Sequence, residues 1–133
     1  MVAFSFMKRF VADVEAGRKL QTMRKGALRC KVGDRVQLYY GQRTKHCRKL
    51  AESVCTIALP VRLSPYFITV FDWTFPESER DIIARMDGFK NWGELVEFFF
   101  PFGWCGDSDD FIGGLYQWAP LDVQQIEFSI KVE

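Results

Sequence analysis

Lysine, threonine and arginine side chains follow one another closely in a short basic segment near the start of the chain. Lys19, Thr22 and Arg24 fall within six residues. If residues 20–24 are extended, Thr22 and Arg24 share one face and Lys19 stands beside them. An amine, a hydroxyl and a guanidinium so placed can hold a phosphate or carbonyl oxygen. A neutral Lys19 could also attack a carbonyl carbon, given burial or cationic neighbours such as Arg18. The alternative is a solvated basic segment at a helix end.

The charge of the chain is divided between its two halves. Residues 1–62 hold 14 Lys and Arg against 4 Asp and Glu, residues 63–133 hold 4 against 13, and the net charge is +1. This division predicts one face that binds an anion and a second, acidic face, unless the two halves neutralise each other.

The densest cationic stretch follows two tyrosines. Its cations can bind phosphates while unstacked bases lie on the rings, so it is a candidate nucleic-acid surface together with Arg18 and Arg24. The alternative is a solvated loop after two strand tyrosines. The tyrosines are Tyr39 and Tyr40, and the cations that follow them are Arg43, Lys45, Arg48 and Lys49.

Four short sequence patterns lie in a fixed order along the chain. They are Gly17-x-Lys19-x-x-Thr22-x-Arg24, Val32-Gly33-Asp34 before a strand, Gly41-x-Arg43-Thr44-Lys45-x-Cys47-Arg48, and Asp87-Gly88-Phe89 before the helix start Asn91-Trp92-x-Glu94-Leu95. Together they resemble the ASCH domain of the PUA-like superfamily, most nearly the short ASCH proteins of bacteria and their phages. The resemblance covers nearly the whole chain, from a helix that ends at Gly17 to a strand that ends at Trp118.

The resemblance implies a fold and an activity. The fold is a small α+β domain, a β-barrel of short, mostly antiparallel strands with flanking helices, and its cleft acts on RNA or a modified nucleoside. Some ASCH proteins hydrolyse N4-acylated cytidines with a lysine, a threonine and a glutamate, and others are reported as ribonucleases. The first two residues match Lys19 and Thr22, and the third falls at Asp87, which is one methylene shorter.

Three functions therefore stand side by side. The first is an amidohydrolase that uses Lys19, Thr22 and Asp87. The second is an RNA-binding module without turnover, or a ribonuclease. Asp87 could instead only cap the next helix or hold the turn before Gly88. The third is a phage or host interaction factor whose acidic half binds a partner protein. A displacement of about 1 Å can lower the rate of proton transfer to a general base roughly a hundredfold. The reach of the shorter Asp87 side chain therefore decides between the first function and the second.

A helix and a run of strands must position these residues. Apolar spacing predicts a helix over residues 6–14, capped by Ser5 and ended by Gly17. Alternation predicts strands over residues 35–40, 53–63, 67–71, 115–118 and 126–132. Pro60 removes one ladder donor, so it predicts an edge strand or a bulge.

Two further helices interrupt the strands. One covers residues 77–86 after Pro76. The other begins at Asn91, with Glu94 reaching back to complete the cap, and ends before Pro101. Six aromatic residues crowd the second helix and its end, and they predict core packing or one wall of the cleft. They are Trp92, Phe98, Phe99, Phe100, Phe102 and Trp104.

Composition places the chain in a broad class. Its 133 residues, 48% hydrophobic and 16% aromatic, predict one domain over residues 1–133 with a real core. Neither a secretory signal nor a membrane span is expected, so the prediction is a cytoplasmic protein with reduced thiols and a buried Cys55. The four cysteines form no CxxC pair, and the single histidine, His46, adjoins Cys47. No metal or cofactor is therefore predicted.

Overall fold

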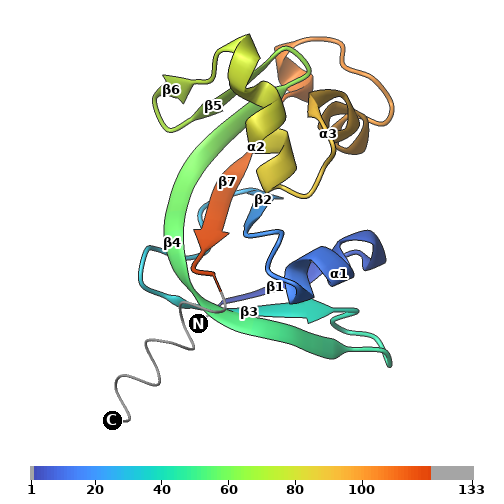
Figure 1. Cartoon of the computed structure of the whole chain (residues 1–133). Helices are drawn as coiled ribbons and strands as arrows, with labels where there is room; N and C mark the ends of the chain where they lie inside the picture. Colours follow the sequence, from blue (N-terminus) through green and yellow to red (C-terminus); the bar gives the residue numbers. More distant parts are fainter. Residues whose placement is uncertain (1, 121–133) are drawn as a thin grey trace.

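The computed structural model describes residues 2–120, which form seven strands, three α-helices and two 3-10 turns (Figure 1). The strands are β1 (Val2–Phe6), β2 (Gln21–Lys25), β3 (Arg35–Tyr40), β4 (Arg48–Ser64), β5 (Phe67–Val70), β6 (Trp73–Thr74) and β7 (Phe111–Trp118). The helices are α1 (Lys8–Glu15), α2 (Arg80–Met86) and α3 (Trp92–Phe99), and the 3-10 turns are η1 (Glu77–Glu79) and η2 (Asp107–Asp109). The α+β class with mostly antiparallel strands is confirmed.

The long, curved strand β4 organises the sheet. Its first part pairs with β3, which pairs in parallel with β1. Its second part lies between β7 and β5, and β2 and β6 extend the sheet beyond these two. Over residues 2–120 the sheet does not close, because β1, β2 and β6 each pair on one side only. The expected closed barrel is therefore wrong for this part of the chain. Instead, β4 curves from one group of partners to the other, with a bulge between Cys55 and Ile57.

The start of the chain differs from the expected helix over residues 6–14. Val2–Phe6 is a strand in which Phe4 and Phe6 are buried, and the helix begins only at Lys8. Ser5 lies in β1 and does not cap the helix, whose N-cap is Met7. The Ser5 hydroxyl oxygen accepts a hydrogen bond from the backbone amide of Gln42. Residues 2–6 form a strand because each of the five pairs in register with a residue of β3, and the alternation of a strand buries Phe4 and Phe6 on one face. The helix ends before Gly17 as expected, with φ +75° at that residue.

The later elements follow the sequence more closely. The structure has strands at Arg35–Tyr40 and Phe67–Val70, and Asn91 accepts a hydrogen bond from the Glu94 amide at 2.9 Å to cap α3. The Glu94 side chain does not reach back to the cap, because it pairs with Arg9. Pro60 pairs with Gly114 of β7, and the pairing of β4 with β5 begins only at the next residue, so the missing N–H lies where β4 has a partner strand on one side only, as expected of an edge position. The strand expected over residues 126–132 lies outside the described residues.

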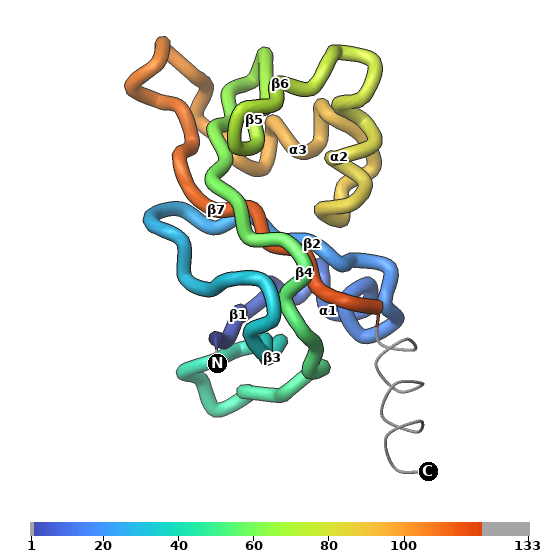
Figure 2. The backbone as a smooth tube through the Cα atoms, turned by 90° about the vertical axis from the view of Figure 1, so that its left-hand side faces the viewer, coloured from blue at the N-terminus to red at the C-terminus, as the bar shows by residue number. Residues whose placement is uncertain are grey.

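The helices lie on two sides of β2. Figures 1 and 2 show α2 and α3 side by side at one end of the sheet, α1 towards the other end, and β2 passing between. Phe10 and Val14 of α1, Leu95 of α3 and Tyr116 of β7 are among the buried core residues, and Cys55 is buried as expected. No helix within residues 2–120 is long and apolar enough to cross a membrane. The arrangement leaves the basic segment of residues 17–24 at the junction of the three helices.

Candidate functional site

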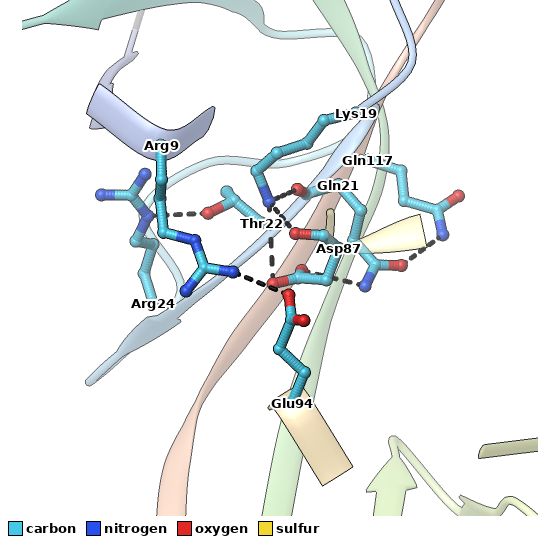
Figure 3. Close-up of polar contacts among 8 residues, drawn as sticks. All are labelled: Arg9, Lys19, Gln21, Thr22, Arg24, Asp87, Glu94 and Gln117. Carbon is cyan, nitrogen blue, oxygen red and sulfur yellow. Dashed lines mark hydrogen bonds and ion pairs between the residues drawn. The ribbon is translucent and has the colours of Figure 1, made fainter. Parts of the chain in front are cut away.

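The structure brings the three predicted catalytic residues together. Lys19, Thr22 and Asp87 line one pocket of about 190 Å³, with Arg24 on the same wall (Figure 3). Lys19 follows α1, Thr22 and Arg24 lie on β2, and Asp87 is the C-cap of α2. The other walls are mainly apolar and are formed by Ser5, Phe6, Met7, Phe10, Met23, Phe98 and Phe99. We call this space the Lys19 pocket.

The Lys19 amine is almost fully enclosed. Its side chain is 2% exposed, and Nζ donates to the backbone carbonyls of Gln21 at 2.6 Å and Asp87 at 2.5 Å. The Asp87 carboxylate Oδ2 lies 3.6 Å from Nζ, and the Phe10 ring centroid lies at 4.7 Å. Three oxygens around one amine suit an ammonium, which has three N–H donors and no acceptor. Lys19 also links β2 to the carbonyl end of α2, where a cation is favoured.

Asp87 is held from two sides. Its carboxylate Oδ1 accepts a hydrogen bond from the Gln21 side-chain amide at 3.0 Å, and Oδ2 faces Lys19. The residue is 3% exposed. It does not cap the next helix, since Asn91 and Asp81 accept the hydrogen bonds from the first amides of α3. The alternative capping role is therefore not what the Asp87 side chain does in this structure.

Burial changes the pKa values of both partners. Loss of water lowers the pKa of Lys19 to about 8, against the opposing effect of the Asp87 carboxylate, and Arg24 lowers it further. The same loss of water raises the pKa of Asp87, while Lys19, Gln21 and Arg24 act in the opposite direction. A pKa of about 8 leaves Lys19 protonated at neutral pH, in agreement with its three oxygen neighbours.

Thr22 and Arg24 form a second polar pair on the same strand. The Arg24 guanidinium donates from Nε to the Thr22 hydroxyl at 2.9 Å, and its Cζ lies 5.0 Å from the Phe6 ring centroid. Burial lowers the pKa of Arg24 to about 10, with Arg29 adding to the effect. The Thr22 oxygen accepts this bond, so its own proton is free for a group in the pocket.

The remaining predicted binding residues lie elsewhere. Tyr39 and Tyr40 are half-buried on β3, and Arg43 and Lys45 are exposed in the turn after it. Arg48 pairs with Glu15 through two hydrogen bonds of 2.8 and 3.1 Å. None of these five residues lines the Lys19 pocket. Arg18, also predicted, is exposed beside the pocket and pairs with Asp13 at 2.8 Å.

Two glutamines were not identified from the sequence. Gln21 is fully buried, and Gln117 donates to its side-chain oxygen at 2.9 Å, so that the Gln21 amide nitrogen is turned towards Asp87. The two residues are register partners of β2 and β7. The pairing of these strands cannot be read from residue spacing, so no sequence signal marks the glutamines.

A larger pocket lies elsewhere among residues 2–120. It measures about 690 Å³ and lies against α2, β5 and β7. Its walls include the exposed side chains of Phe71, Trp73 and Ile82, and its ionisable residues are Asp72 and Glu79. Apolar walls without a cation or a buried ionisable pair give it no chemistry comparable to the Lys19 pocket.

Gly88 supports the Lys19 pocket through its backbone. It has φ +95°, and a Cβ there would lie 3.1 Å from Lys19 Cδ and 3.1 Å from Phe10 Cδ1. We expect Gly88→Ala to lower the free energy of unfolding by about 1–2 kcal/mol, the cost of a left-handed residue, and to lower it further because the added Cβ displaces Lys19 or Phe10. Denaturant unfolding measures the first effect. Gly103→Ala is the matched control, because that glycine also has positive φ but no atom within 4 Å of its Cβ position. Equal losses in the two variants would contradict a specific contact with Lys19.

Comparison with known proteins gives no match of any kind: no family model, no curated protein and no solved structure matches this chain.

Proposed function

We propose that this chain is an ASCH-like amidohydrolase that removes the acyl group from an N4-acylated cytidine. The observation that carries the proposal is the meeting of Lys19, Thr22 and Asp87 around one small pocket, although Asp87 lies 68 residues beyond Lys19 in the sequence. The choice of reaction rests on the sequence patterns that resemble the ASCH domain. The PUA-like assignment belongs to the same proposal.

The size of the pocket suits only part of such a substrate. Pockets that enclose a whole small molecule commonly measure roughly 300–1,000 Å³. The Lys19 pocket, at about 190 Å³, admits the acyl group and its amide and leaves the sugar outside. The Phe98 and Phe99 rings form part of its wall, as the aromatic cluster predicted, and they exclude water from the reacting bond.

The arrangement favours water over Lys19 as the nucleophile. A neutral amine would direct its lone pair at an oxygen, because carbonyl oxygens and the Asp87 carboxylate surround Nζ. As an ammonium, Lys19 instead stabilises through its positive charge the negative oxygen that develops on the acyl carbonyl, and the Thr22 hydroxyl donates a hydrogen bond to that oxygen.

Asp87 is the general base in this proposal. Its carboxylate accepts a proton from water as the water oxygen bonds to the acyl carbon. The tetrahedral intermediate then collapses, the bond from carbon to N4 breaks, and Asp87 returns the proton to the departing N4. The products are a carboxylic acid and cytidine. A raised pKa makes Asp87 a stronger base for this step.

Release of cytidine from a panel of N4-acylated cytidines, followed by chromatography, tests the proposal. We expect release by the native chain and by Lys25→Ala, which removes an exposed cation of β2, and none by Lys19→Ala. A faster Asp87→Glu would locate the base. No release from any member of the panel by folded protein would falsify the proposal and place RNA binding without turnover ahead of hydrolysis.

The rate should fall at alkaline pH if Lys19 acts as a cation. Its pKa of about 8 predicts that kcat/KM declines above that pH as the ammonium loses its proton. Arg24 lowers this pKa, so Arg24→Gln should move the decline to higher pH, whatever it does to the maximal rate. The measurement is a pH profile of cytidine release. A profile flat to pH 10 would rule out the cationic role of Lys19.

A further inference from the structure

A second hollow lies on the other side of Lys19. It measures about 530 Å³ and is bordered by residues of α1, of the end of α2 and of the start of α3. Its cations are Arg9, Arg18, Arg85 and Lys90, together with Lys19. We call it the cationic hollow. Lys19 lines both this hollow and the Lys19 pocket.

The cationic hollow has more positive than negative charge. Its acidic residues are Asp13 and Glu94, and each already holds one cation: Asp13 pairs with Arg18 at 2.8 Å, and Glu94 pairs with Arg9 at 2.7 Å. Arg85 and Lys90 pair with no carboxylate among residues 2–120, and both are exposed. The charge of Lys19 is balanced by Asp87. Two cations therefore remain for an anion from outside.

The hollow is also shaped by fixed parts of the fold. Gly88, at its floor, has no side chain, and the Arg9 guanidinium is held over the Phe10 and Phe89 rings at 4.9 and 5.2 Å. An arginine fixed between a carboxylate and two rings has lost much of its rotamer freedom before a ligand binds. Arg85 and Lys90 lie five residues apart on either side of the Asp87 turn, which Lys19 anchors.

We propose that the cationic hollow binds a phosphate group of the substrate whose acyl end enters the Lys19 pocket. Arg85 and Lys90 bind the phosphate oxygens, and Arg9 and Arg18 border them. The substrate then binds more tightly as a nucleotide or an RNA residue than as a free nucleoside. The position of the acyl end rests on the proposed function, but phosphate binding does not require turnover.

This assignment differs from the surface expected from the sequence. In the cationic stretch after Tyr40, Arg48 forms an ion pair with Glu15 and Lys49 forms one with Glu52. None of the residues of this stretch lines the Lys19 pocket. The cationic hollow adjoins the ionisable pair and collects cations from residues 9, 18, 85 and 90, which are far apart in sequence. Proximity to Lys19 favours the hollow as the site that selects the substrate.

The experiment compares the binding of cytidine, cytidine 5′-monophosphate and a short single-stranded RNA by titration calorimetry at low salt. We expect the monophosphate or the RNA to bind at least about tenfold tighter than cytidine, since hydrogen bonds from cationic side chains to phosphate oxygens are charge-assisted and stronger than neutral ones. The double variant Arg85→Ala/Lys90→Ala should abolish that difference. The matched control, Lys25→Ala, removes an exposed cation that lies outside the hollow and outside the predicted nucleic-acid surface, and it should preserve the difference.

The ligands distinguish two sources of the phosphate. Tight binding of the monophosphate indicates a free nucleotide. Tight binding of RNA alone, with a salt slope of about 0.7 per phosphate that decreases in the double variant, indicates a phosphodiester. Equal binding of all three ligands, no binding of any, or an unchanged preference in the double variant would overturn the inference. A chain that binds the phosphate but releases no cytidine would refute only the proposed hydrolysis.

Discussion

Replacing Lys19 with Met should abolish cytidine release and lower the free energy of unfolding by about 3–5 kcal/mol. The loss of stability is large because the change leaves the Asp87 carboxylate buried without its cation. It also removes the hydrogen bonds to the carbonyls of Gln21 and Asp87. Denaturant unfolding measures the stability, and chromatography measures the release.

A double variant separates catalysis from folding. Lys19→Met/Asp87→Leu removes both charges, and well-packed apolar side chains often replace a buried ion pair without loss. We expect it to recover much of the stability lost in Lys19→Met and none of the activity. If the double variant is no more stable than the single one, the two residues do not form the buried pair seen in Figure 3.

Asp87→Asn should slow cytidine release by about 10²–10⁴-fold, the usual contribution of a general base. The asparagine keeps the size of the side chain and an oxygen that can accept from Gln21, so the loss should be chiefly in kcat. Kinetic measurements of kcat and KM separate this outcome from weaker binding.

The control for this change is Asp81→Asn. Asp81 also lies on the α2 side of the turn and accepts a hydrogen bond from the Trp92 amide at 2.8 Å, but it does not line the Lys19 pocket. We expect it to retain full activity. A rate for Asp87→Asn within threefold of the native rate would exclude Asp87 as the base, since three is far below the usual contribution.

Local patterns predicted the parts of the fold that depend on local physics. Alternation placed β3 at its observed bounds, and the Asn91 cap located the start of α3. The same reasoning failed at residues 2–6, where Phe6 was assigned to a helix. Phe4 and Phe6 are buried by pairing with β3, more than thirty residues away in sequence, and a local pattern does not contain that partner.

The candidate site also has one part that the local sequence pattern predicts and another that depends on contacts between distant segments. Thr22 and Arg24 were placed together from strand periodicity alone, because neighbours at period two share a face. The position of Asp87 relied on the resemblance to ASCH proteins, and its contact with Gln21 relies on the docking of α2 against β2. Arg85 and Lys90 carry no motif, so only the packing of the helices shows that they share a hollow with Lys19.

The double attachment of Lys19 makes the pocket and helix α2 one mechanical unit. One amine holds a carbonyl of β2 and the last carbonyl of α2, so the helix end cannot swing away from the sheet without releasing the amine that the proposed reaction uses. Amide hydrogen exchange in the last turn of α2 therefore reports on the integrity of the pocket, and a ligand that stabilises the ammonium should slow that exchange. In this chain, the same local unfolding that opens the end of α2 also releases the Lys19 amine from its position in the pocket.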